Sequence, residues 1–253
     1  MAVPLGLVLF LMTVPSFARK VSDKVFPLDM AEKSVDDSYE GCRENMKNKV
    51  LSRYLEQEKK KTPGFAAAWN QALNKRKKHE LGKYQSAAIY MYTKEPKNEN
   101  NFSYKKFNEA TRDGSQAYLS DKFQFYTLHF FLTDAIQQLK RNCVTTYRRT
   151  KVKFVTNVLK KKIRFGSFTS TSVYMNVTRF GEVSCFQVKT CEGAAIAKYS
   201  AMEVEKEVLI PPYEVFEVTA IKKRSQDKNL WCEVVYELKS NGTLSNLQCK
   251  KSK

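Results

Sequence analysis

The sequence predicts an α+β fold, with helices in the first half of the chain and strands in the second. Between about 36 and 140, apolar residues recur at helical spacing, and Glu, Lys, Leu and Ala are frequent. From about 143 to 240 the chain changes to short β-branched and aromatic segments, which are typical of strands. With 253 residues, 42% of them hydrophobic, the chain can bury one sizeable core. We therefore expect a single globular domain.

The chain begins with an uncharged apolar run, residues 1–18, that ends in the small-x-small site Ser16-Phe17-Ala18. This run is too short to span a bilayer and is typical of a secretory signal peptide, so we expect residues 19–253 to form the mature domain. We expect no later transmembrane segment and no lipid-anchor signal, because no second long apolar run follows. These features predict a secreted, extracellular protein.

The helical half contains three recognisable segments. Residues 36–83 should form two or more amphipathic helices, interrupted by the Thr-Pro-Gly turn at 62–64. Residues 87–93 are a short apolar, aromatic-rich run, so we predict a buried strand there, followed by a loop. A broad apolar stripe over 123–139 predicts a core helix. His129 lies in that helix, where a core or interface role is a better interpretation than a catalytic one.

The second half predicts a series of short strands. Pro211-Pro212 should end one of them and turn the chain into the next. The segments expected to form strands are residues 144–147, 163–169, 183–190, 195–199, 205–210, 213–221 and 230–238.

Two glutamates, Glu205 and Glu207, alternate along one of these predicted strands just before an apolar run. Strand side chains alternate between faces, so both carboxylates would share one face about 7 Å apart. Two like charges held together are unfavourable unless water, a cation or a cationic substrate lies between them. A solvated acidic face on an edge strand is the alternative interpretation.

Two further segments carry groups that suit phosphate and sugar oxygens. Arg148 and Arg149 end a short strand, and the planar fork of arginine suits bidentate contact with phosphate. A strand-like stretch leads into Ser170-Thr171-Ser172, whose hydroxyls could hold sugar or phosphate oxygens or orient a carboxylate. Taken separately, a surface basic pair and a Ser/Thr run at a strand end are both common.

Taken in order, the arginine after a strand, the Ser-Thr-Ser and the Glu-x-Glu before Val-Leu-Ile-Pro-Pro resemble the signature of vertebrate arginine-specific ecto-ADP-ribosyltransferases. The resemblance implies a helical region packed on a mixed β-sheet core. It also implies transfer of ADP-ribose from NAD, a co-substrate, to arginine side chains of protein acceptors, with release of nicotinamide and no metal. Further stretches look like the same family, so that the resemblance covers essentially the whole mature chain: residues 37–42, 88–93, 107–110 and 190–200.

The resemblance assigns roles to four site residues. Glu207 matches the catalytic glutamate, which would stabilise the oxocarbenium-like ribosyl cation and contact a ribose hydroxyl. Glu205 matches the glutamate that would bind the acceptor guanidinium and take up its proton. Arg148 would hold the NAD diphosphate, and Ser170 would position Glu207 and the nicotinamide-side ribose. Residues 200–204 correspond to the family's acceptor-recognition loop.

Arg149 departs from the family pattern, in which glycine commonly follows the arginine. If the backbone at this position needed a positive φ, an arginine there would be costly. We therefore expect the departure to bear on NAD geometry and turnover.

Six cysteines in an exported chain suggest disulfides, and none has the close pairing or histidine neighbours of a zinc site. The resemblance implies two bridges, Cys42–Cys249 and Cys143–Cys191. Cys185 and Cys232 are left over in predicted strands, and we predict that they form a third.

The formal net charge of +18 should draw the protein to anionic surfaces such as glycosaminoglycans. Solvated positive faces without a specific partner are the alternative interpretation. Asn101, Asn176 and Asn241 begin acceptor triplets, which predict glycosylation in a secretory compartment. We expect a monomer.

Three other interpretations stay open at this point. The same site could act as an NAD glycohydrolase with water as acceptor, although Glu205 favours transfer to arginine. A catalytically silent basic binding protein would use the charge alone. A nuclease would need His79 and His129 as an acid–base pair, and neither lies in a convincing site.

Overall fold

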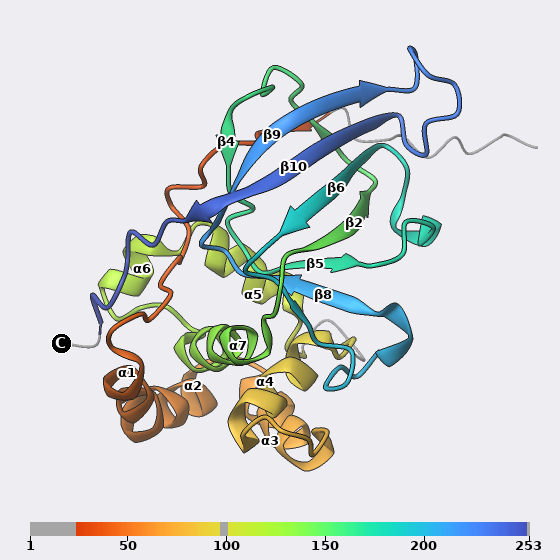
Figure 1. Ribbon diagram of the computed structural model, residues 1–253. Helices are drawn as coiled ribbons and strands as arrows, with labels where there is room; N and C mark the ends of the chain where they lie inside the picture. Colours follow the sequence, from red (N-terminus) through yellow and green to blue (C-terminus); the bar gives the residue numbers. More distant parts are fainter. Residues whose placement is uncertain (1–23, 97–100, 252–253) are drawn as a thin grey trace, which may run out of the picture.

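The computed structural model describes residues 24–96 and 101–251, so the predicted signal peptide lies outside the described residues. The helices gather along one side of a strongly curved, eight-stranded mixed sheet (Figure 1). The predicted α+β class is confirmed, because the helices come first in the chain and the strands of the large sheet follow them.

The helical part is built around α7 (Tyr126–Leu139), which packs against its neighbours α2 and α4, the π-helical turn η1, and strand β7 (Figure 1). The predicted core helix is thus confirmed. The remaining helical elements are α1 (Arg43–Lys49), η1 (Val50–Tyr54), α2 (Leu55–Lys61), α3 (Phe65–Lys75), α4 (Lys83–Thr93), α5 (Tyr104–Arg112) and α6 (Ser115–Leu119).

The strand predicted at 87–93 is wrong, because these residues form the second half of helix α4. The helix packs against both α3 and α7, and most of its last two turns are buried. A helix covered on several sides keeps apolar residues around most of its circumference, so its sequence loses the helical period and cannot be distinguished from that of a buried strand.

The large sheet has the strand order β4-β9-β10-β6-β2-β5-β8-β7. Strands β10 and β6 run parallel, and the other neighbouring pairs run antiparallel. Strands β1 and β3 form a separate two-stranded ladder. The strand bounds are β1 Val25–Phe26, β2 Val144–Thr150, β3 Lys153–Phe154, β4 Lys162–Ile163, β5 Thr169–Ser172, β6 Ser184–Thr190, β7 Ala194–Ala195, β8 Glu207–Ile210, β9 Glu214–Lys223 and β10 Val234–Thr243.

The segment predicted as one strand over 163–169 divides into β4 and β5. Between them Arg164 is buried in an ion pair with Asp36 (2.5 Å), and Gly166 has φ +70°. A strand cannot continue through a left-handed residue, so the chain leaves β9 and re-enters the sheet beside β2. The predicted strand at 195–199 is likewise reduced to β7.

Strand β8 separates two hydrophobic cores. Leu209 packs into the helical core, whereas the adjacent Ile210 packs with Phe186, Phe216 and Tyr236 in the core of the sheet. Because strand side chains alternate, Glu207 lies on the same side as Leu209 and faces the helices.

Three disulfides tie the chain together, and they are the three pairs expected from the sequence. Cys42–Cys249 joins the start of α1 to the C-terminal segment, and Cys143–Cys191 joins the start of β2 to the end of β6. Cys185–Cys232 anchors β6 to the segment before β10.

His129 is a core residue, which confirms the interpretation from the sequence. Its ring lies within hydrogen-bond distance of the Tyr39 hydroxyl (2.7 Å) and the Val35 carbonyl (2.9 Å), and it is fully buried. Burial lowers the pKa of His129 to about 4, so the ring is neutral at physiological pH.

Candidate active site

The site is assembled where β5 meets β8. In this antiparallel pair Ser172 lies opposite Glu207, and Ser170 lies opposite Leu209. Directly opposed residues share a face, so the two serines and Glu207 lie on the side of the sheet that faces the helices. Glu207 is only 5% exposed. A carboxylate this deeply buried, on a strand whose other residues are apolar, is the type of group found at functional sites.

Helices α4 and α5 support the strand that carries Ser170. The Tyr92 hydroxyl donates to the Phe168 carbonyl (3.1 Å) and lies 3.5 Å from Ser170 Oγ. The Asn108 amide donates to both the Tyr92 hydroxyl (3.1 Å) and the Phe168 carbonyl (3.0 Å). Burial, followed by the negative charge of Glu207, raises the pKa of Tyr92 to about 12. Tyr92 is therefore a neutral hydroxyl close to the Glu207 carboxylate.

Arg148 enters the site from β2, the strand beside β5. One guanidinium nitrogen donates to the Ser170 carbonyl at 2.8 Å. Burial lowers the pKa of Arg148, and the nearby Tyr92, Tyr104 and, to a smaller extent, Glu207 oppose that shift. An arginine titrates far above physiological pH, so the guanidinium stays charged. The structure thus brings together three of the four predicted site residues: Arg148, Ser170 and Glu207.

The backbone at Glu205 differs from the prediction. Strand β8 begins at Glu207, and Glu203–Glu205 form a single 3₁₀ turn, η3. Lys206 between them has a left-handed backbone, with φ 45°. β8 is paired with β5 only as far as Ser172, the last residue of β5, so nothing holds the preceding residues extended. The expectation that both glutamates alternate along one strand is therefore wrong.

The turn that contains Glu205 belongs to the segment 200–206, in which residues 202–204 and 206 are exposed. The Ala201 amide donates to Thr93 Oγ1 (2.9 Å), which fixes the start of the segment to the end of α4. Lys77 bridges to Glu203 at 2.7 Å, and Val204 is 79% exposed. A partner as large as a protein can contact this exposed segment, whereas it cannot reach the buried Glu207 beside it.

The backbone cost expected at Arg149 does not arise. Arg149 pairs with Cys185 in the regular ladder between β2 and β6, and it has no positive φ. Its side chain leaves the opposite face of β2 and contacts Trp231.

Two contributing residues, Tyr92 and Asn108, were not assigned to the site from the sequence. Both lie in stretches that resemble the family, but Tyr92 was interpreted as part of a buried strand. The signal that could have found Tyr92 is a hydroxyl within an otherwise apolar, buried segment, since buried polar groups need partners. Asn108 lies in the charged stretch of α5, which carries no such signal.

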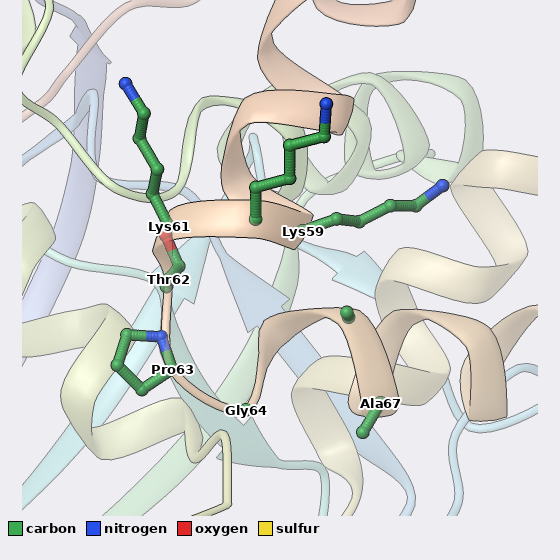
Figure 2. Close-up of a pocket in the computed structure, with 8 residues that line it drawn as sticks. Lys59, Lys61, Thr62, Pro63, Gly64 and Ala67 are labelled. Atoms are coloured by element: carbon green, nitrogen blue, oxygen red, sulfur yellow. The ribbon is translucent and has the colours of Figure 1, made fainter.

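A separate cavity of about 360 Å³ lies where α2 turns into α3, lined by lysines and the Thr62-Pro63-Gly64 turn. Figure 2 shows the side chains of Lys59 and Lys61 diverging from the end of α2. None of the predicted site residues lines this cavity, and no carboxylate does. The cavity therefore does not coincide with the candidate site at β5 and β8.

Within residues 24–96 and 101–251, no group of three or more His, Cys, Asp or Glu side chains could hold a metal ion. In the same part of the chain, no helix has the length and hydropathy needed to cross a bilayer.

Comparisons with known proteins agree on one family. A family model described as NAD:arginine ADP-ribosyltransferase matches residues 28–236. NAD(P)(+)–arginine ADP-ribosyltransferase 1 of Gallus gallus is 35% identical over 238 residues, which cover 88% of this chain and 72% of that protein. GPI-linked NAD(P)(+)–arginine ADP-ribosyltransferase 1 of Mus musculus is 34% identical, over 79% of this chain and 67% of that protein. The crystal structure of a variant of the mono-ADP-ribosyltransferase ART2.2 in complex with NAD matches with a TM-score of 0.70 and 25% identity, over 88% of this chain and 98% of that one.

Proposed function

The chain belongs to the NAD:arginine ADP-ribosyltransferase family, and we propose that Glu207, Glu205, Ser170 and Arg148 carry out its reaction. The reaction moves ADP-ribose from NAD to an arginine side chain of a protein and releases nicotinamide. The observation that carries this assignment is the buried Glu207, which faces the helices beside Ser170 and within electrostatic reach of Arg148.

On the donor side, the bond between ribose and nicotinamide breaks with positive charge building on the sugar. A carboxylate in a low-dielectric site stabilises such charge better than water does. Glu207 has this environment, because burial removes water and the Tyr92 hydroxyl close by is neutral. Ser170, held by Tyr92, would contact the ribose, and the Arg148 guanidinium would hold the diphosphate.

On the acceptor side, a guanidinium is a poor nucleophile while it is protonated. Glu205 would bind the acceptor guanidinium and accept a proton as its nitrogen attacks the ribose carbon. Its backbone place in a turn whose neighbours Val204 and Lys206 are exposed, two residues before the buried Glu207, supports this division of labour. The segment 200–206 would recognise the acceptor protein.

We propose further that residues 19–253 form a single secreted catalytic domain. Three disulfides suit an oxidising compartment, and the names of relatives place them outside the cell. Asn176 and Asn241 are exposed and accessible to glycosylation, and Asn101 is partly exposed. The charge of +18 would concentrate the protein on anionic surfaces such as glycosaminoglycans.

The test is a reaction of the oxidised protein with labelled NAD and agmatine, an arginine mimic, in which nicotinamide and ADP-ribosyl-agmatine are measured together. We expect both products in equal amounts. Glu207→Gln, which keeps the shape of the side chain, should reduce both rates by about 10²-fold or more, since it removes a charge that stabilises the transition state.

The matched control is Glu217→Gln, the same change on β9, which should keep the wild-type rate. Nicotinamide without the adduct would identify an NAD glycohydrolase instead. A folded protein that forms neither product would leave a silent basic binding protein, and the proposal would be wrong.

A further inference from the structure

Arg149 contacts a loop that begins beside the proposed site. This 173–183 loop joins the end of β5 to the start of β6. Because the last residue of β5, Ser172, lies opposite Glu207, the loop leaves the sheet directly beside the proposed catalytic glutamate. Strand β5 lies between β2 and β8, and Ser172 also pairs with Tyr147 of β2. The loop therefore starts between the strand that carries Arg148 and the strand that carries Glu207.

The Arg149 guanidinium contacts both ends of this loop. Its Nε donates to the Met175 carbonyl at 2.7 Å, and an Nη donates to the Gly181 carbonyl at 3.4 Å. The same Nη lies 3.8 Å from the Glu182 carboxylate. The side chain is only 7% exposed. Hydrogen bonds from a charged donor are stronger than neutral ones, and shielding from water strengthens them further.

The far side of Arg149 rests on a fixed platform. Its guanidinium lies 4.8 Å from the centre of the Trp231 ring and donates to the Trp231 carbonyl at 3.3 Å. Trp231 precedes Cys232, which is bonded to Cys185, the residue opposite Arg149 in the ladder. The disulfide and the ring therefore prevent the anchor from moving relative to β6.

The C-terminal end of the loop is also tied to its neighbours, because the Val183 amide donates to the Thr150 carbonyl at 3.1 Å and the Glu182 carbonyl accepts from the Glu233 amide at 2.7 Å. The part before it, residues 173–181, contains a single 3₁₀ turn, Thr178–Phe180. Its backbone hydrogen bonds near the tip are local, from Thr178 to Asn176 and from Gly181 to Thr178. Four of its apolar side chains are 40–51% exposed instead of packed in a core: Val173, Tyr174, Met175 and Phe180. A segment with few buried contacts opens easily unless a specific interaction orders it.

We propose that Arg149 is a positioning residue for NAD, which orders the 173–183 loop beside Glu207 so that the dinucleotide meets a preformed wall. This inference rests on the proposed function. Arg149 acts on the loop and not on the reacting atoms, because its guanidinium donates to the Met175, Gly181 and Trp231 carbonyls. Loss of Arg149 should lower the fraction of molecules in which the loop is ordered. The affinity for NAD should fall in proportion to that fraction, while the rate of the chemical step stays nearly unchanged.

The experiment compares Arg149→Met and Arg149→Lys with the wild type. Hydrogen exchange of the 173–183 amides measures loop order, and initial rates with NAD and agmatine separate kcat from KM. For Arg149→Met we expect loop exchange and the KM for NAD to rise by about tenfold, as for the loss of a charged hydrogen bond, while kcat is nearly unchanged. Lysine keeps the charge but not the planar fork, so Arg149→Lys should fall between the two.

The matched control is Arg141→Met, which removes the same charge from an exposed arginine whose bonds within the described residues go to carbonyls of its own turn, and it should behave as the wild type. If Arg149→Met does not fold, Arg149→Lys carries the comparison.

Unchanged loop exchange in the Arg149 variants would overturn the proposal, as would a fall in kcat with an unchanged KM. A wild-type protein without NAD turnover would refute the proposed function, and the positioning of NAD with it. The exchange data would still decide separately whether Arg149 orders the loop.

Discussion

At the scale of single residues, Arg148 and Arg149 show how a strand divides two identical side chains between two tasks. Arg148 donates to the Ser170 carbonyl, and the negative charge of Glu207 acts to raise its pKa. Arg149 points the other way and contacts Trp231 and the Gly181 carbonyl. In the sequence they are one basic pair, and only the alternation of strand side chains assigns each its partners.

Arg148→Lys tests the first of these tasks. A lysine keeps the positive charge but loses the planar fork that can contact a diphosphate and the Ser170 carbonyl together. We expect the KM for NAD to rise by roughly 10- to 100-fold, equivalent to the loss of one or two charged hydrogen bonds. The measurement is the initial rate over a range of NAD concentrations, with Arg141→Lys as control. An unchanged KM would show that Arg148 does not contact the donor.

At the scale of elements, a buried carboxylate joins α2 to the start of α7. Both oxygens of Glu58 accept from the Thr127 amide, at 3.2 and 3.3 Å, which satisfies a backbone donor in the first turn of α7. Glu58 is only 4% exposed, and burial raises its pKa to about 8, against the opposing effect of these hydrogen bonds. The contact therefore fixes the start of α7, the central helix, but it places an ionisable carboxyl group in the core.

This pKa predicts a pH dependence of stability. An unfolded Glu58 would titrate near 4.5, so between about pH 4.5 and about pH 8 the folded state binds the proton more tightly. The contribution of Glu58 to the free energy of unfolding is complete below this window and is lost as the pH rises through it. Glu58→Gln removes this titration. As the pH rises through the window, the free energy of unfolding of the variant should therefore increase relative to that of the wild type by several kcal/mol, at about 1.4 kcal/mol per pH unit.

Urea unfolding of both proteins at pH 5 and pH 8 measures this difference. Asp37 and His129 also titrate with shifted pKa values, but they are common to both proteins and cancel. The control is Glu56→Gln on the exposed face of α2, which should show no such gain. Parallel pH profiles for Glu58→Gln and wild type would contradict the prediction.

At the scale of the whole molecule, the Cys42–Cys249 bridge ties the start of the helical region to the C-terminal segment across 207 residues. The same region carries the buried ion pair of Arg164 with Asp36, whose carboxylate also accepts from the Asn246 and Leu247 amides (both 3.0 Å). Helices, sheet and C-terminal segment are therefore joined at one place.

Removal of this bridge by the double substitution Cys42→Ala/Cys249→Ala should lower the free energy of unfolding by about 5 kcal/mol, because the unfolded chain regains the entropy of a long closed loop. The measurement is the urea midpoint under oxidising conditions. Cys143→Ala/Cys191→Ala, with a separation of 48 residues, should cost less. An equal or smaller loss for the Cys42–Cys249 pair would contradict this ordering.

The sequence predicted helices and breaks well where the spacing of apolar residues along the chain matches the pattern of buried residues in the fold. The helix α7 follows from its apolar stripe, and the break between α2 and α3 follows from Pro63 and Gly64. It failed at α4, where burial on several sides removes the period, and at Glu205, where the strand ends because its partner β5 ends. Both failures arise from neighbours that are distant in the chain.

By itself, the sequence determined the α+β class and the order of arginine, serine and glutamates along the chain. It also predicted the cysteine pairs, two through its resemblance and the third because Cys185 and Cys232 were left over. Only the tertiary structure decided that Tyr92 and Asn108 brace the serine strand, that Glu205 lies in a turn, and that Arg149 holds a loop. The reason is physical. Propensity and period act over a few neighbouring residues, whereas strand pairing and the satisfaction of buried polar groups depend on which distant segments the packed core brings together.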